Sequence, residues 1–515
     1  MQRLKLTTAG KVVVFLVIAA LVLGGTYFMG GLDIAKSLFG HKTQVASNNT
    51  TQSTDIPKKT DKNVIDISLD EWIGWKSIVD ANGGLATKPG SIYDKLGIKV
   101  NIHVVDDANQ TSNALISGNL DGAGYTINRY AFLNAKFKDN KVATVMPFIT
   151  NFSSGGDGII AKKGINRIED LVGKTIGVPR FSEAQTLVEW LIAKSDLTAD
   201  QKKQIKYVFF EDAEETGKAF YAGKVDAAAT WQPYLSQASD PNSNAQILFS
   251  TKSASNIILD GIVFRKDFYD SHKEQVAKLI QGAIQAQALY TQQPEVIKGI
   301  MPQMADMTPK EIVEMTDDAT LADYGTNMKL LSAGGLASTL FADMSNIWTN
   351  LGEKADSADA SKVFDTGALQ LIAGKVPTGA VQTPKFTEEQ RQSVVSKPAL
   401  LTKKVSIQFK VDSDEFFDKE GAYKAMNDLV NPAKIVDGMI IQIEGNTSSD
   451  GDPAINKELS YKRARAVGSY LKMQGLDATR FVVVGNGSDK PIGDNNTQNG
   501  REVNRRTEVF FKAVD

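Results

Sequence analysis

One loop of this sequence reads Gly445-Asn446-Thr447-Ser448-Ser449-Asp450-Gly451, and it directly follows a predicted strand at Ile440–Glu444. A predicted helix at Ile455–Met473 comes next and contains Leu459-Ser460-Tyr461-Lys462-Arg463-Ala464-Arg465-Ala466-Val467. A closing strand begins with Asn504-Arg505-Arg506-Thr507-Glu508. The closing strand is expected at Thr507–Lys512, and the remaining predicted elements of this region are a helix at Lys419–Val430 and two strands at Val405–Val411 and Phe481–Gly485. This order predicts a βαβαββ domain, an α+β sandwich, over residues 404–515.

Arg463 has an unusual place in the long helix. The apolar residues of that helix fall on one face, at Ile455, Leu459, Ala466, Val467, Tyr470 and Leu471. Arg463 is four residues from both Leu459 and Val467, so it lies on or beside this face. A guanidinium on a buried face needs a hydrogen-bond acceptor. The acceptor is either a ligand in a pocket or a nearby acidic group, and an arginine that extends to solvent is a further alternative.

These three stretches resemble the OmpA-like family, whose members bind the peptide stem of peptidoglycan. The resemblance implies that Arg463 binds the carboxylate of the diaminopimelate stem, for which a bidentate guanidinium is suited. It also implies that Asn504 and Arg506 belong to the closing motif of the site.

Position 448 departs from the family pattern. The family has an aspartate fifteen residues before the arginine, which accepts the ammonium group of the stem, and here Ser448 occupies that position. Asp450 is a candidate replacement if the loop folds differently. Three outcomes are therefore open. The domain binds the wall more weakly, it binds a stem of different chemistry, or it no longer binds the wall and contacts another protein.

Predicted strands and helices alternate from Val64 onward. The strands are expected at Val64–Leu69, Lys99–Val105, Gly122–Tyr125, Ile159–Ala161, Thr175–Val178, Lys206–Phe210, Ala227–Thr230 and Ile262–Arg265. Such alternation predicts parallel sheets with crossover helices. The region from Gln293 to Gly374 is expected to be almost wholly helical.

Three phrases in this region resemble the type-II periplasmic substrate-binding proteins of the nitrate, sulfonate, taurine and pyrimidine-precursor group. They are Ile116-Ser117-Gly118-Asn119-Leu120-Asp121-Gly122-Ala123, Ile168–Val178, and Ala222-Gly223-Lys224-Val225-Asp226-Ala227-Ala228 with Trp231-Gln232-Pro233. The resemblance implies a two-lobed α/β fold over residues 64–374 that binds a small polar or anionic solute.

Residues just after the strands are the candidates for ligand contact. Ligands of open α/β sheets lie beyond the carboxyl ends of the strands, where helix N-termini point. The candidates are Trp72, Trp75, Tyr125, Thr126, Ser153, Ser154, Gly155, Gly156, Ser182, Glu183 and Trp231. Core packing of the tryptophans, a flexible turn at residues 153–156 and a simple helix N-cap at Ser182 are the alternatives.

The N-terminal residues 12–31 read VVVFLVIAALVLGGTYFMGG and carry no charge. A helix of this length spans roughly 30 Å, the thickness of a bilayer core. The basic residues before it favour a cytosolic tail over residues 1–11. A cleaved signal peptide is the alternative. Residues 32–63 are expected to form a flexible tether, and residues 375–403, with three prolines, a linker between the domains.

Composition excludes several kinds of function. The chain has no cysteine and only three histidines, which are far apart in the sequence, so thiolate chemistry and a histidine metal site are not expected. A net charge of −2 gives no reason to expect nucleic acid as a partner. Gly173-Lys174-Thr175 lacks the earlier glycine of a phosphate-binding loop, because residue 168 is isoleucine. We expect no cofactor and no enzymatic activity.

The sequence thus predicts a membrane-anchored extracytoplasmic solute-binding protein of the ABC-transporter type, tethered to peptidoglycan by its last domain. The alternative is a structural envelope protein that links the membrane, or a membrane complex, to the cell wall without binding a ligand. An apolar, filled space between the lobes would favour the alternative.

Overall fold

The computed structural model describes residues 56–232, 234–292, 294–298, 307–379, 384–405, 407, 409–410 and 413–514. The predicted cytosolic tail, the membrane anchor at residues 12–31 and most of the tether lie outside these residues. Within the described ranges, no helix is both long and apolar enough to cross a bilayer.

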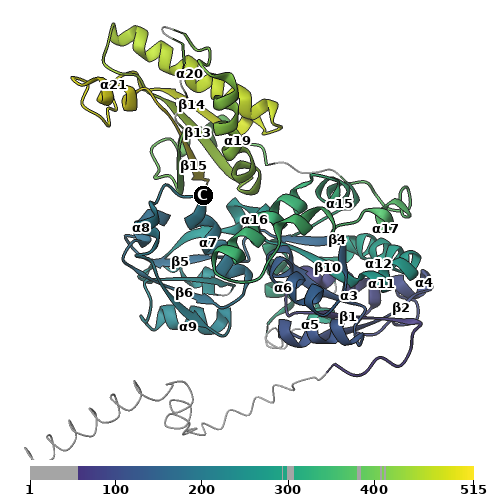
Figure 1. Cartoon of the computed structure of the whole chain (residues 1–515). Helices are drawn as coiled ribbons and strands as arrows, with labels where there is room; N and C mark the ends of the chain where they lie inside the picture. The colour runs from purple at the N-terminus through teal and green to yellow at the C-terminus, as the bar shows by residue number, and fades with distance from the viewer. Residues whose placement is uncertain are drawn as a thin grey trace, which may run out of the picture. The chain divides into compact units, whose positions relative to one another are not determined.

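The first lobe is built on a six-stranded sheet with the order β11-β4-β10-β3-β1-β2. Its strands are β1 (Val64–Leu69), β2 (Lys99–Val104), β3 (Gly122–Thr126), β4 (Thr144–Ser153), β10 (Leu259–Arg265) and β11 (Ala319–Leu321). Helices beside it are α3 (Lys76–Asn82), α5 (Ala108–Ser117), α6 (Ile127–Asp139) and α12 (Lys273–Ala286) (Figure 1).

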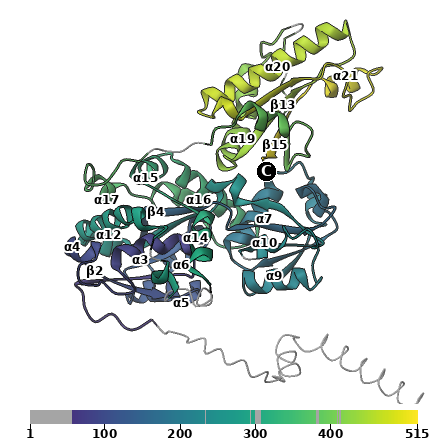
Figure 2. The same cartoon turned by 180° about the vertical axis from the view of Figure 1, so that it is seen from behind.

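The second lobe is built on a five-stranded sheet with the order β7-β6-β8-β5-β9. Its strands are β5 (Asp157–Lys162), β6 (Thr175–Pro179), β7 (Lys206–Phe210), β8 (Ala227–Trp231) and β9 (Ala245–Ser250). Helices α7 (Glu183–Lys194), α9 (Ala213–Tyr221) and the short α10 (Tyr234–Gln237) pack beside this sheet (Figure 2).

The predicted parallel pairs are present in both sheets, but each sheet also contains antiparallel strands, and the mainly helical region from residue 293 to 374 also contains the short β11. β10 is antiparallel to β3 and β4, and β5 is antiparallel to β8 and β9. Each of these two strands enters its sheet from the other lobe at the carboxyl ends of the parallel strands, so it must run the opposite way. β11 pairs with the last residues of β4, and this end of β4 also lies at the carboxyl ends of the parallel strands.

One long helix contacts both lobes. α16 (Leu336–Asn350) packs against α6 of the first lobe and α7 of the second. Trp348 Nε1 donates to the Asn128 carbonyl at 3.0 Å, and Trp190 Nε1 donates to Asp343 Oδ2 at 3.3 Å. Phe132 and Phe181 stack nearby, with ring centroids 5.1 Å apart. The lobes therefore share a packed side along α16.

The C-terminal domain has a four-stranded sheet with the order β12-β15-β13-β14. Its elements in chain order are β12 (Leu401–Val405), α19 (Lys419–Ile435), β13 (Met439–Gly445), α20 (Pro453–Met473), β14 (Phe481–Gly485), α21 (Gln498–Asn504) and β15 (Thr507–Ala513). The predicted βαβαββ order is present, with the short α21 added before the last strand. The first strand begins earlier than predicted, at Leu401.

Part of the predicted linker packs onto this domain. Phe386 and Val394 contact Ile440 and Val482 on the sheet, and the buried ammonium of Lys512 donates to the Val394 carbonyl at 3.1 Å. The remaining short helices are α4 (Ile92–Lys95), α8 (Ala199–Lys202), α11 (Lys266–Ser271), α13 (Glu295–Lys298), α14 (Pro309–Met315), α15 (Tyr324–Leu331), α17 (Gly367–Gln370) and α18 (Glu388–Ser393).

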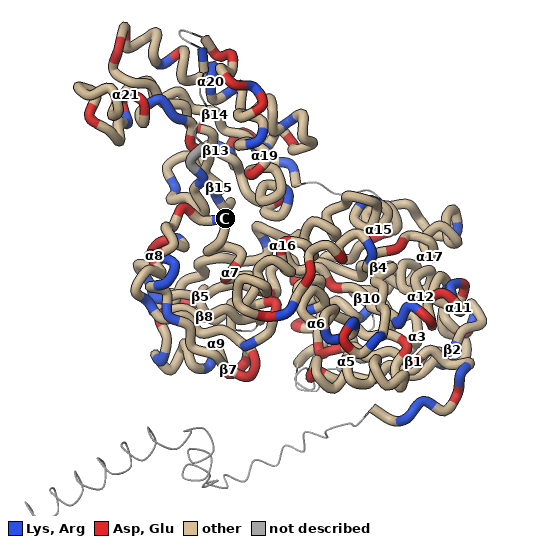
Figure 3. The backbone as a smooth tube through the Cα atoms, viewed as in Figure 1, with Lys and Arg blue, Asp and Glu red and all other residues tan. Residues whose placement is uncertain are grey.

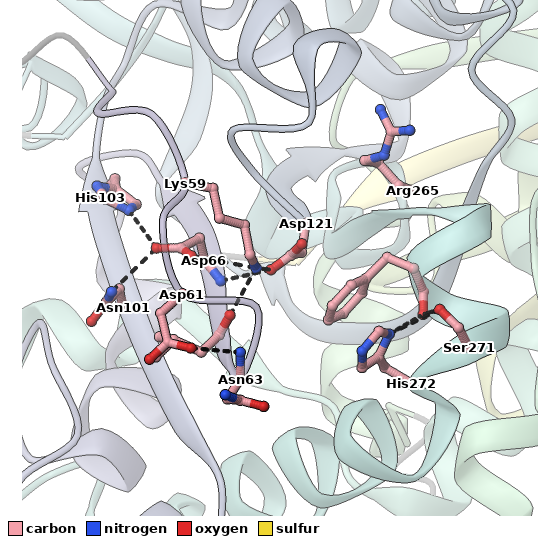
Figure 4. Close-up of polar contacts among 12 residues, drawn as sticks. Lys59, Asp61, Asn63, Asp66, Asn101, His103, Asp121, Arg265, Ser271 and His272 are labelled. Atoms are coloured by element: carbon pink, nitrogen blue, oxygen red, sulfur yellow. Dashed lines mark hydrogen bonds and ion pairs between the residues drawn. The ribbon is translucent and has the colours of Figure 1, made fainter.

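The end of the predicted tether is fixed to the first lobe by Lys59. Its ammonium lies between Asp66 and Asp121, with an ion-pair distance of 3.4 Å to Asp66, and donates to the Val64 carbonyl at 2.7 Å (Figure 4). His103 and Asn101 also contact Asp66, both at 3.2 Å. These residues lie near the starts of β1 and β3, at the opposite end of these strands from their carboxyl ends.

Arg480 is a buried cation that holds the C-terminal domain together. Its guanidinium donates to the carbonyls of Met439, Ala433 and Val436 at 2.9, 2.7 and 2.6 Å. Burial lowers the pKa of Arg480 to about 10, which leaves it charged at neutral pH. The side chain thus joins the end of α19 to the start of β13 and β14.

We expect Arg480→Leu to destabilise this domain by about 3 kcal/mol or more, because three buried carbonyls lose their donor and each loss costs roughly 1–3 kcal/mol. Urea unfolding followed by circular dichroism measures the change. Arg465→Leu is the matched control, since Arg465 is exposed in the same domain, and it should have little effect. Equal stabilities of the two variants would contradict the structural role of Arg480.

Candidate functional site

Two crossover segments connect the lobes and run side by side. One leads from Ser153 to Asp157 and the other spans residues 250–259. The fully buried Thr251 joins them: its Oγ1 lies 2.9 Å from Ser153 Oγ and accepts from the Gly155 N–H at 2.9 Å. The carboxyl ends of both sheets therefore meet here. We call this place the lobe junction, and it comprises the crossovers and the side chains of Asp70, Trp72, Arg129, Asp157, Glu183, Trp231 and Asp260.

Trp72 lies across the first crossover. It follows β1, and its indole N–H donates to Asn151 Oδ1 at 2.9 Å. A Cβ added to Gly156 would lie 2.3 Å from Trp72 Cη2, which no real side chain permits. Glycine at residue 156 is therefore required for the indole to rest on the crossover. The hydrogen bond and this contact together fix the orientation of the ring.

An ion pair joins the lobes across the junction. Thr126 caps α6 by accepting from the Arg129 N–H at 3.0 Å, and Ser182 caps α7 by accepting from the Gln185 N–H. These caps place Arg129 and Glu183 in the first turns of two helices that face each other. Arg129 Nη2 and Glu183 Oε2 are 2.9 Å apart. Burial opposes the charge of Arg129, but Glu183 and then Asp70 raise its pKa above the ordinary value.

The other carboxyl groups of the junction have raised pKa values, because their surroundings oppose ionisation. Burial, followed by the charge of Glu183, raises the pKa of Asp157 to about 7. Burial and Asp106 raise the pKa of Asp70 to about 6. Burial also raises the pKa of Asp318, which lies beside the crossover, to about 6. The junction therefore has more acidic groups than Arg129 can neutralise.

Asp260 is the most deeply placed of these acids. It lies on β10 between Thr126 of β3 and Asn151 of β4. Directly opposed residues of an antiparallel pair project to the same face, so its carboxyl points toward the α6 cap and the Trp72–Asn151 contact. Asp260 is 4% exposed, and among the described residues no group donates a hydrogen bond to its carboxyl. Burial, then Asp70 and Asp157, raise its pKa well above the ordinary value.

The structure brings several predicted residues together at the junction, namely Trp72, Ser153, Ser154, Gly155, Gly156, Glu183 and Trp231. Trp231 is 37% exposed and stands opposite Asp157 in the β5–β8 pair, so both side chains lie on one face. Ser154 Oγ lies 2.7 Å from Thr320 Oγ1, so this hydroxyl already has a protein partner.

Four predicted residues support the junction from behind it. Trp75 is 1% exposed and donates its indole N–H to Asp70 Oδ1 at 2.5 Å. Tyr125 is also buried, and its hydroxyl lies 2.7 Å from Thr111 Oγ1. Thr126 and Ser182 act as the helix caps described above. These side chains hold the acids and the two helices in place.

The sequence analysis did not select Asp70, Arg129, Asp157 or Asp260. Asp70 and Asp157 are close to predicted strands and to selected residues, so their positions in the sequence could have identified them as candidates. Arg129 is in the first turn of a helix after a strand, which is also recognisable. Asp260 precedes the predicted strand Ile262–Arg265, and only the longer observed β10 shows that an acid lies within it.

In the C-terminal domain, Arg463 finds its acceptors in the backbone. Its Nε donates to the Ser413 carbonyl at 3.1 Å, and Nη2 donates to the Lys410 carbonyl at 3.2 Å. The guanidinium also lies over the Phe409 ring, 5.0 Å from its centroid. Arg463 is 7% exposed, so the predicted buried position is observed.

Ser448 and Asp450 contact each other at the start of α20. Ser448 Oγ donates to Asp450 Oδ2 at 3.0 Å, and Arg501 Nε lies 3.5 Å from the same oxygen. Asp450 is thus next to position 448, as the sequence suggested, but it already has a cationic neighbour.

Asn504 and Arg506 order the segment before the last strand. Asn504 Oδ1 accepts from the N–H groups of Ile492 and Gly493 at 2.7 and 2.8 Å. Arg506 Nη2 pairs with the buried Glu508 at 2.7 Å. A hollow of about 490 Å³ lies on this domain, and none of the five predicted wall-binding residues lines it; its lining is Ser413, Asp414, Ala454, Ile455, Glu458, Leu459 and Lys462.

Two family models match the chain. Residues 408–505 match the OmpA family, and residues 88–297 match the family described as NMT1/THI5 like. A solved structure, the periplasmic aliphatic sulphonate binding protein SsuA from Escherichia coli, is similar with a TM-score of 0.46 and 15% identity, covering 58% of this chain and 98% of that one.

Curated relatives are similar over shorter stretches. Outer membrane protein A of Bordetella avium is 31% identical over 190 residues, which are 35% of this chain and 89% of that protein. Outer membrane porin F of Pseudomonas fluorescens is 28% identical over 201 residues, and the chain spans only 58% of that protein. Peptidoglycan-binding protein ArfA of Mycobacterium bovis is 36% identical over 87 residues, 17% of this chain and 27% of that protein. Through its C-terminal domain the chain belongs to the OmpA family, and before that domain it carries a two-lobed, NMT1/THI5-like domain of the type-II periplasmic-binding-protein kind.

Proposed function

We propose that this chain is a solute-binding protein of the cell envelope, of the type that serves ABC transporters, held at peptidoglycan by its C-terminal domain. In this proposal residues 12–31 anchor it in a membrane, with the bulk of the chain outside the cytoplasm. The two family matches support the two domains. The structural alternative has the same domains but no ligand between the lobes.

The observation that favours solute binding is the polarity of the lobe junction. A binding domain that had lost its ligand would be expected to fill this space with apolar side chains. Instead Asp157 and Asp260 are 6% and 4% exposed there, and Arg129 pairs with Glu183 beside them. Buried charges lower the stability of a protein and are most often kept where they bind something. We therefore propose Trp72, Trp231, Asp157 and Asp260 as ligand contacts, with the other predicted residues as their support.

The charge of Asp157 should make the stability of the ligand-free protein depend on pH. A carboxyl whose pKa is raised from 3.8 to about 7 binds a proton more tightly in the folded state. Its stabilising effect is complete below pH 4 and is lost as the pH rises through 7. Each pKa unit corresponds to about 1.4 kcal/mol, so up to about 4 kcal/mol is lost by pH 8.

Asp157→Asn removes this ionisation, so the variant should be more stable than the wild type at pH 8 and nearly equal to it at pH 3.5. Thermal unfolding of the ligand-free protein at both pH values measures this. Asp200→Asn is the control, because Asp200 is exposed on α8, and it should follow the wild type. A variant less stable than the wild type at pH 8 would show that the Asp157 carboxylate stabilises the fold.

The proposal of wall binding rests on the C-terminal family match and on the similarity to proteins named as peptidoglycan-binding. We propose Arg463, with Ser448, Asp450, Asn504 and Arg506 around it, as the stem-binding residues. In the structure Arg463 is bonded to two carbonyls, at Ser413 and Lys410. A stem carboxylate must therefore replace or share these bonds.

Sedimentation of the whole chain with purified diaminopimelate-type peptidoglycan tests this proposal. The wild type should pellet with the wall, and Arg463→Ala should weaken binding by about tenfold or more, since a hydrogen bond to a charged group contributes roughly 1.5–3 kcal/mol. Arg465→Ala, an exposed arginine of the same helix, should bind like the wild type. If the wild type stays in solution and only Ser448→Asp pellets, the domain has lost the wall and its partner is another protein.

A further inference from the structure

The lobe junction has a large local excess of acidic groups. Across the whole chain, 58 Lys and Arg nearly balance 60 Asp and Glu, and the two signs are interspersed along it (Figure 3). At the junction the balance is different. The acids come from six elements: Asp70 after β1, Asp106 after β2, Asp157 on β5, Glu183 on α7, Asp260 on β10 and Asp318 beside β11. Arg129 is a cation that lowers the pKa values of Asp70, Asp106 and Asp260.

Arg129 pairs with Glu183 through Nη2, at 2.9 Å. This leaves Asp70, Asp157 and Asp260 without a cationic partner among the described residues. Asp70 accepts one hydrogen bond from the Trp75 indole. Asp260 has no hydrogen-bond donor in the described part of the chain although it is 4% exposed. An unpartnered carboxyl that is so deeply buried indicates a missing partner, and the charge of its surroundings indicates that the partner is positive.

Several of the donors that an anion would need are already occupied. The Gly155 N–H donates to Thr251 at 2.9 Å, and the Ser154 N–H donates to the Asp318 carbonyl at 2.8 Å. Ser182 Oγ donates to the Pro179 carbonyl at 2.7 Å. An anion placed here would face several carboxyls, although the buried Arg129 Nε has no hydrogen-bond partner among the described residues. Of the expected polar or anionic solutes, the surrounding carboxyls therefore do not favour the anionic ones.

Aromatic surfaces adjoin the free acids. Trp72 is half-buried and its ring is fixed over Gly156, and Trp231 is 37% exposed on the same face as Asp157. A tryptophan face attracts an organic cation through the ring quadrupole. A bare metal ion fits less well, because within the described residues no three acidic or histidine side chains are arranged to hold one.

We propose that the lobe junction binds an organic ammonium ion, with Asp157 and Asp260 opposing its charge and Trp72 and Trp231 facing its apolar part. This inference rests on the proposed solute-binding function and names the chemical class of the solute. Binding has a proton balance: a carboxyl that is protonated in the empty protein gives up its proton to the buffer when the cation arrives.

The proton balance gives the pH dependence of binding. With a pKa of about 7 for Asp157 in the empty protein, the affinity for a permanent cation should rise roughly tenfold between pH 6 and pH 8, because the carboxyl must first lose its proton. An anion would show the opposite trend, since it binds best when the acids are neutral. A neutral solute would show little dependence on pH.

The test is calorimetric titration of the full chain with tetramethylammonium, choline and putrescine as cations, nitrate and methanesulfonate as anions, and glucose as a neutral solute. The expected result is binding of at least one of the cations, with the tenfold rise from pH 6 to pH 8 and with proton release seen in buffers of different ionisation enthalpy. Asp260→Asn and Asp157→Asn should each weaken this binding by tenfold or more, and Asp200→Asn should leave it unchanged.

Two other results would overturn the inference, and they differ in what they imply. Binding of an anion or of glucose, weakened by Asp157→Asn or unaffected by it, would reject the cationic class and leave the solute-binding function standing. Absence of binding by every probe would reject both and favour the structural alternative. Thermal unfolding of each variant shows whether it is folded, so a loss of binding is assigned only to folded protein.

Discussion

The hydroxyl of Thr251 holds the two crossover segments together, and the arrangement of both lobes follows from this contact. The chain passes between the lobes where Thr251 joins the crossovers at Ser153 and Gly155, and β10 and β5 each enter a sheet there, at the carboxyl ends of its parallel strands. Those are the ends at which α6 and α7 begin. The strands that break the parallel order, β10 and β5, are therefore the ones that carry Asp260 and Asp157 into the junction.

The two candidate sites differ in how their polar groups are satisfied. In the C-terminal domain Arg463 has backbone acceptors, and the partners of Asn504 and Arg506 are likewise within the domain. A ligand there must compete with the protein itself. At the lobe junction Asp260 has no such donor among the described residues, so a ligand would supply a contact that the fold leaves out. On this ground the junction is the stronger of the two sites.

The sequence was sufficient to predict local features, but it was insufficient to predict the balance of charged groups at the lobe junction. The βαβαββ order of the last domain followed from period and turn residues, and the buried place of Arg463 followed from its spacing to Leu459 and Val467. The antiparallel β10 and the short β11 were missed, because pairing between distant segments leaves no mark in local periodicity. Asp260 was missed for the same reason: its neighbours Thr126 and Asn151 are far from it in sequence, and only the sheet register places them beside it.

The raised pKa values of the junction acids help to separate a binding role from a structural one. A carboxyl kept for folding is normally paired, and pairing lowers its pKa, as at Asp226, where the hydrogen bond from Lys162 and those from Thr175 hold it at about 2. Asp157 shows the opposite: its environment opposes ionisation and so weakens the fold as the pH rises. Among the described residues, the hydrogen bond from Ser153 lowers the pKa of Asp157 but does not cancel the effect of burial. A cation that exchanges for the proton would offset it, so the group that destabilises the empty protein is the one that would stabilise the complex.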